Sequence, residues 1–162
     1  MTAQQQFESF LRKYDPAIAA ETKKVLAKLR KLVPGAVEMV YDNYNALVIG
    51  FCPGMRPSEA ILSIAVSPRW VTLCFLDGKG LPDPEKRLRG SGNLVRNIRL
   101  EGGAKALADP YLRTLIGHAL ERAKVPIPAG QKSQFLIKSV SAKQRPRRPT
   151  KRKALARSSQ PN

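Results

Sequence analysis

Aromatic and arginine side chains gather along the middle of this 162-residue chain, and together they suit the binding of a small anionic molecule. Aromatic rings can form the walls of a concave site, and arginine carries a permanent charge. Strand ends and a long polar loop at 77–93 can bring these side chains to one place. The candidate ligand-binding residues are Tyr41, Asp42, Tyr44, Trp70, Arg87, Arg89, Arg96 and Arg99. The alternative is that the rings belong to the core and the arginines are solvated.

The segment Gly90–Leu100 combines a glycine-rich turn with a strand, and it contains Arg96, whose predicted surroundings are unusual for an arginine. Alternation places Leu94, Arg96, Ile98 and Leu100 on one strand face, which is otherwise apolar. Burying an unpaired guanidinium is costly. Arg96 is therefore expected either to meet a carboxylate, or to lie at the rim of the sheet and face a cavity.

No motif for catalysis, a cofactor or a metal is visible. A nucleophile needs an adjacent base, and none stands near Ser58, Ser63 or Ser91 in the sequence. The glycines at 90 and 92 precede a strand, whereas a dinucleotide fingerprint precedes a helix. One histidine and two cysteines do not provide a zinc site. The sequence therefore predicts a protein that is not an enzyme and holds no cofactor or metal.

The net charge of +17 is spread unevenly, because residues 126–162 contain ten basic residues and no acidic one. Dense basic runs bind phosphate backbones with little sequence preference and with strong salt dependence. The candidate nucleic-acid-binding residues are Lys143, Arg145, Arg147, Arg148, Lys151, Arg152 and Lys153. The alternative is a tail that aids solubility or docks a protein partner.

Hydrophobic periodicity and turn signals predict an α+β domain at 1–140, followed by a disordered basic tail at 141–162. Helices are expected at 7–14, after Asp15-Pro16 and after Asp109-Pro110, where aspartate precedes proline at the first helical position. Strands are expected at 37–41, 46–51, 61–66, 70–76, 95–100 and 135–140, the last at an edge. Short connections favour an antiparallel sheet of five to six strands packed against the N-terminal and C-terminal helices.

Two further expectations concern location and the thiols. No apolar run is long enough to cross a membrane, and the first residues lack the pattern of a signal peptide, which predicts a cytoplasmic protein with no membrane partner. Cys52 and Cys74 fall in apolar strand-like runs and are expected to be buried free thiols.

Several stretches resemble the YdhG-like family, a bacterial domain of unknown function. They read YDNYNAL at 41–47, PRWVTL at 68–73, GLPDP at 80–84, LRGSGN at 88–93 and VRNIRL at 95–100. The stretch IKSVSAKQRPRRP at 137–149 is similar to the end of a subset of the family. The resemblance implies a small α+β domain with an antiparallel sheet covered by helices, and it implies no established reaction.

Some members of that family are linked to frataxin-like iron delivery, which needs oxygen ligands clustered on a surface. Twelve acidic residues against 29 basic ones disfavour that role here. The predicted function is therefore a non-enzymatic binding domain for a small anionic ligand or a protein partner. The alternative is a nucleic-acid-associated protein that is anchored through its basic C-terminal tail.

Overall fold

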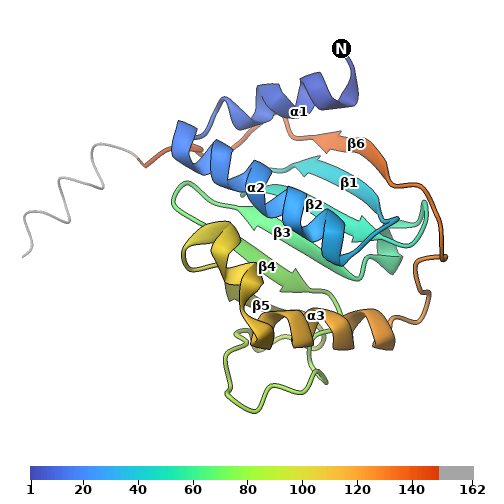
Figure 1. The fold of residues 1–162 in the computed structure, drawn as a ribbon. Coiled ribbons are helices and arrows are strands. Elements are labelled where there is room, and N and C mark those ends of the chain that lie inside the picture. Colours follow the sequence, from blue (N-terminus) through green and yellow to red (C-terminus); the bar gives the residue numbers. More distant parts are fainter. Residues whose placement is uncertain (150–162) are drawn as a thin grey trace, which may run out of the picture.

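The computed structural model of the chain describes residues 1–149 (Figure 1). The α-helices are α1 (Ala3–Leu11), α2 (Pro16–Leu32) and α3 (Pro110–Arg122), and the short 3-10 helices are η1 (Pro57–Glu59) and η2 (Gly103–Ala108). The strands are β1 (Val37–Asp42), β2 (Leu47–Cys52), β3 (Leu62–Val66), β4 (Val71–Phe75), β5 (Arg96–Arg99) and β6 (Gln134–Val140). The predicted α+β class is confirmed.

The six strands form one mixed sheet in the order β5-β4-β3-β2-β1-β6. The first five strands pair antiparallel with their neighbours, as short connections predict. The expectation of an entirely antiparallel sheet is wrong for β6, which lies at the predicted edge but runs parallel to β1. The chain reaches that edge through η2 and α3, and a long crossover of this kind is what a parallel pair requires.

The main core lies between the helices and one face of the sheet. Val40, Ile49, Ile64 and Leu73 sit in matching positions on neighbouring strands and are fully buried in one cluster with residues of all three α-helices. Figure 1 shows α2 crossing in front of the sheet. Alternation along each strand therefore sends one set of side chains under the helices and the other set to the opposite face.

The helix starts follow from local sequence. Asp109 accepts a hydrogen bond from the backbone N–H of Tyr111, and Pro110 occupies the first turn of α3. Pro16 likewise begins α2 after Asp15, although the Asp15 side chain makes no capping hydrogen bond.

Both cysteines are free thiols in strands that flank β3. Cys52 in β2 is buried, as predicted, whereas Cys74 in β4 is only partly buried. Two strand spacings separate β2 from β4, or about 9.6 Å, which exceeds the Cα separation that a disulfide allows. The two thiols therefore cannot bridge without movement of the backbone.

Candidate functional site

The eight predicted ligand-binding residues do not converge on one concave site. Asp42 pairs with Leu47, and the register continues through Val66 to Val71, so these residues share one end of the sheet. This end carries the β1–β2 turn at 43–46 and the β3–β4 turn at 67–70, and we refer to it as the turn end. Arg96 pairs with Phe75 at the opposite end. The predicted single pocket is therefore wrong.

The arginines of the long loop and of β5 are occupied by local contacts. The guanidinium of Arg87 forms an ion pair with Asp109 at 3.0 Å and lies 4.7 Å from the centre of the Tyr111 ring. Arg96 donates to the backbone carbonyls of Gly92 and Val95 at 2.7 and 2.8 Å, so its charge faces the glycine-rich turn. These contacts therefore include neither the carboxylate nor the cavity that was predicted for Arg96.

Two more predicted residues also lie apart. The backbone of Arg89 pairs with Asn97, and the Arg89 side chain is exposed. Tyr41 is half-buried in a small cluster with Met39 on the face of the sheet opposite the main core, and its hydroxyl donates to the Met39 sulfur at 3.8 Å.

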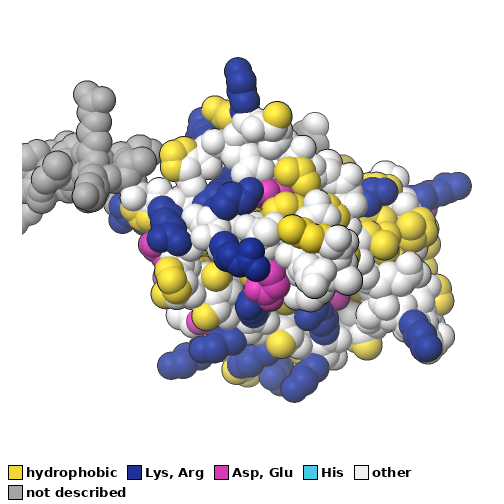
Figure 2. Space-filling model, turned by 90° about the horizontal axis from the view of Figure 1, so that it is seen from above, with side chains coloured by type: hydrophobic (Ala, Val, Ile, Leu, Met, Phe, Trp, Pro, Cys, Tyr) yellow, Lys and Arg dark blue, Asp and Glu magenta, His cyan; other side chains and the backbone are white. Residues whose placement is uncertain are grey.

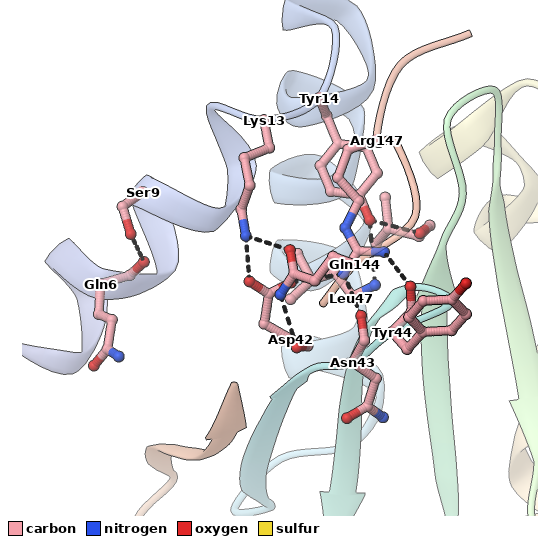
Figure 3. A network of polar contacts seen from close by, with 11 residues as sticks. Gln6, Ser9, Lys13, Tyr14, Asp42, Asn43, Tyr44, Leu47, Gln144 and Arg147 are labelled. Carbon is pink, nitrogen blue, oxygen red and sulfur yellow. Dashed lines mark hydrogen bonds and ion pairs between the residues drawn. The ribbon is translucent and has the colours of Figure 1, made fainter. Parts of the chain in front are cut away.

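Asp42 lies at the centre of a buried polar network at the turn end (Figure 3). Its carboxylate is fully buried and accepts from the Lys13 ammonium at 2.5 Å and the Arg147 guanidinium at 2.9 Å. The side-chain amide of Gln144 donates to the Asp42 backbone carbonyl at 3.0 Å. Arg147, which the sequence placed in a disordered tail, is thus buried against a residue of β1.

The network also sets the charge of Asp42. Burial acts to raise the pKa of this carboxyl, but the ammonium of Lys13, the amide of Gln144 and the guanidinium of Arg147 outweigh it. The pKa of Asp42 is therefore held below its ordinary value, and the carboxylate stays ionised inside the protein.

Residues 141–149 form a strap across the turn end. The backbone N–H of Ser141 donates to Asp42 at 2.9 Å, and that of Arg145 donates to Tyr44 at 2.8 Å. The guanidinium of Arg148 reaches the backbone carbonyl of Lys13 at 3.3 Å. The predicted disorder is therefore wrong for 141–149, because a buried carboxylate on β1 recruits a cation from this segment. The predicted sites Lys151, Arg152 and Lys153 lie outside the described residues.

The strap brings residues of the predicted nucleic-acid site close to residues of the predicted ligand-binding site. Tyr44 is half-exposed, and the guanidinium of Arg145 lies 5.6 Å from the centre of its ring. Trp70 is partly exposed in the β3–β4 turn, and the Arg99 guanidinium lies 3.7 Å from its ring centre. Lys143 is exposed on the same strap. The turn end therefore combines two arginine–aromatic pairs from segments that are distant in the sequence.

A pocket of about 330 Å³, which was not predicted from the sequence, lies at the other end of the sheet. Its wall is largely apolar. It is formed by residues that include Ile61, Phe75, Leu94, Ala119, Ala123 and Val125. Small side chains at the C-terminal end of α3 leave the space, because the apolar stripe has alanine at Ala119 and at the C-cap, Ala123. Those two alanines were the available sequence signal, and Leu94 could not be linked to them from sequence.

Arg122 provides a cation among these apolar groups. Its side chain is 36% exposed, and its nearest carboxylate, that of Asp77, is 3.8 Å away. A Cβ atom at Gly80 would lie 2.7 Å from the guanidinium Nη2, so the glycine allows the loop to pass closely over Arg122. Leu94 and Val125 remain 57% and 44% exposed. The pocket can therefore take an apolar body and place a charged group against Arg122.

Comparison with known proteins adds no assignment, because no family model, curated protein or solved structure matches the chain. Within residues 1–149, no group of three or more His, Cys, Asp or Glu side chains could hold a metal ion. No helix in that part of the chain is long and apolar enough to cross a membrane. The cytoplasmic location stays a prediction.

Proposed function

We propose that the chain is a binding domain for a small molecule with an apolar body and one anionic group, held in the pocket beside Arg122. The observation that supports this proposal is a guanidinium at the edge of an apolar pocket, with its nearest acid 3.8 Å away. Most ligand sites share this composition, with an apolar lining and a few polar groups that fix orientation. Arginine is well suited to the anionic group, because its planar fork matches a carboxylate.

The charges around the pocket favour a monoanion. Its lining residues include Arg122 and Lys124, but also Glu59 and Asp77. These four charges cancel, so the site offers no net attraction to a polyphosphate. The Arg122–Asp77 contact is long and half-exposed, and pairs of this kind contribute little stability. A ligand carboxylate can therefore replace Asp77 at low cost.

The proposal is for binding without catalysis. Ser58 is the hydroxyl among the lining residues, and no histidine accompanies it there as a base. The YdhG-like resemblance also stays a proposal, and the α+β arrangement of the sheet and helices supports it. The frataxin-like alternative requires clustered carboxylates, whereas each acid of the pocket lies near a basic side chain.

Octanoate is a suitable probe, with octanamide as its uncharged counterpart. We expect octanoate to raise the melting temperature and to bind more tightly than octanamide in calorimetric titration. Arg122→Met should weaken octanoate binding by about tenfold or more, because a charge-assisted hydrogen bond is lost. The same substitution should leave octanamide binding nearly unchanged. Arg89→Met is the matched control, since the Arg89 side chain is exposed outside the pocket.

A second variant tests the position of the site. Ala123→Phe adds bulk to the pocket wall and should abolish binding of both probes, while Arg89→Met keeps wild-type affinity. Octanoate binding that survives both Arg122→Met and Ala123→Phe would show that the ligand lies elsewhere, and would overturn the proposal.

A further inference from the structure

The two hairpin turns at the turn end lie side by side. Leu47 of β2 pairs with Val66 of β3, so the β1–β2 turn and the β3–β4 turn project from adjacent strand pairs. The middles of these turns are two strand spacings apart, or about 9.6 Å. Tyr44 stands in the first turn and Trp70 at the end of the second. The turn end therefore presents two separate aromatic rings along one edge of the molecule.

Each ring remains open to solvent despite its arginine partner. Tyr44 is 49% exposed and Trp70 is 36% exposed. Arg145 and Arg99 lie 5.6 and 3.7 Å from the respective ring centres. Exposed rings and guanidinium planes both stack with unpaired nucleobases, and they do so with little dependence on base identity.

Positive charge surrounds the two rings. Among the described residues at this end, eight are basic and three are acidic, a local excess of five. The basic residues are Arg12, Lys13, Arg69, Arg99, Lys143, Arg145, Arg147 and Arg148, and the acidic ones are Asp15, Asp42 and Glu101. Asp42 is fully buried and paired, so it does not face an incoming anion. Figure 2 shows Lys and Arg side chains around the point where the grey residues begin.

The two exposed rings favour a single strand over a duplex. In a duplex the bases stack on one another, so their faces are not available to Tyr44 and Trp70. A single strand presents both phosphates and unstacked bases, which match the cations and the rings. An acidic protein would match the cations but would leave the role of the two rings unexplained.

We propose that the turn end and the strap form a binding surface for single-stranded nucleic acid, in which bases stack on Tyr44 and Trp70 while phosphates meet Arg145, Arg148 and Lys143. This surface is separate from the pocket beside Arg122, because the two lie at opposite ends of the sheet. A result that contradicts nucleic-acid binding therefore does not bear on the proposed small-molecule site.

Trp70 makes the surface directly observable, because it is the single tryptophan of the chain. Titration of the full-length protein with an oligothymidylate of about 20 nucleotides should quench its fluorescence as a base stacks on the indole. The logarithm of the affinity should fall against the logarithm of salt concentration with a slope steeper than about −3, as expected for some five phosphate contacts to a single strand.

Variants separate stacking from simple charge attraction. We expect Trp70→Leu and Tyr44→Leu each to weaken binding of a fluorescein-labelled oligothymidylate by about tenfold, in line with the loss of one stacked base. Lys28→Gln on α2 is the control, since Lys28 is exposed on another surface, and it should change affinity by less than about threefold. Arg122→Met should have no effect, which distinguishes this surface from the pocket.

Three results would overturn the proposal. The first is no binding at about 50 mM salt, where phosphate contacts are strong. The second is binding that leaves Trp70 fluorescence unchanged and tolerates both leucine variants, which would assign the interaction to charge alone. The third is displacement of the oligonucleotide by poly-glutamate or by a blunt duplex at equal charge concentration, which would show that the surface selects only for negative charge.

Discussion

At the scale of single residues, Asp42 decides how the C-terminal segment is placed. A buried carboxylate without partners would be strongly destabilising, so it needs cations close by. Lys13 and Arg147 provide them, from the turn that follows α1 and from the strap. The Arg147 Nε–H lacks a hydrogen-bond partner in the described structure, so the match is not complete. The ion pair between Asp42 and Arg147 nevertheless holds the strap in place, although the strap has little apolar surface to bury.

Substitution of Arg147 should release the strap. We expect Arg147→Met to lower the free energy of unfolding by about 3 kcal/mol, because it leaves Asp42 buried with one cation fewer. Urea denaturation measures that loss, and hydrogen exchange at the backbone amides of residues 141 and 145 should speed up. Arg145→Met is the matched control on the same strap, since Arg145 is exposed, and it should change stability by less than about 0.5 kcal/mol. Equal exchange rates in the two variants would contradict the role given to Arg147.

At the scale of elements, the segment between β5 and α3 is held against α2 by a hydrogen bond from its backbone to a side chain of α2. The carboxylate of Glu21 in α2 accepts from the backbone N–H of Ala104 at 2.5 Å. Gly103 has a positive φ of 69°, and a Cβ atom there would lie 2.0 Å from the Glu21 Oε1. No local sequence signal predicts η2, because its docking depends on the side chain of Glu21, which is 83 residues away in the sequence.

Gly103→Ala tests this contact. The change should destabilise the protein by about 2 kcal/mol or more, since it combines left-handed backbone strain with displacement of Glu21. Gly92→Ala is the control, because its added Cβ would meet no atom within 4 Å and its φ is not in the left-handed region. Thermal unfolding of the two variants measures the difference. Similar melting temperatures would mean that the η2 segment does not need glycine at 103.

At the scale of the whole molecule, stability is tied to pH through the buried carboxylate. The folded-state pKa of Asp42 lies below its unfolded value of about 3.9. The stabilisation that ionised Asp42 contributes is therefore fully present at pH values above the unfolded pKa. That contribution is lost as the pH falls through the folded pKa, where the carboxyl becomes protonated.

Asp42→Asn should make this dependence visible. At pH 7 the free energy of unfolding of the variant should be about 3 kcal/mol lower than that of the wild type, because the substitution leaves Arg147 buried without its counter-ion. The gap should narrow below about pH 4 as the wild-type carboxyl takes up a proton. Asp77→Asn is the control, since its carboxylate is half-exposed and loosely paired. Urea denaturation between pH 7 and pH 2.5 checks this, and a constant gap would contradict it.

Local signals in the sequence determined much of the architecture. Asp15-Pro16 and Asp109-Pro110 mark the starts of α2 and α3, and alternation with short turns marks the strands of the hairpins. These features are predictable because capping, proline geometry and hairpin turns depend on residues that are close in the chain. The basic character of the chain also follows from composition alone.

Tertiary structure decided the parallel pairing of β6, the position of the strap and the separation of the candidate sites. Asp42 and Arg147 are 105 residues apart, and no local pattern links them. The register of the sheet places Arg96 at the end of the sheet away from Tyr44 and Trp70. The pocket beside Arg122 is likewise lined by residues from segments that are distant in the sequence. Long-range pairing of this kind depends on which surfaces pack together, so the residue types alone do not show which side chains come together.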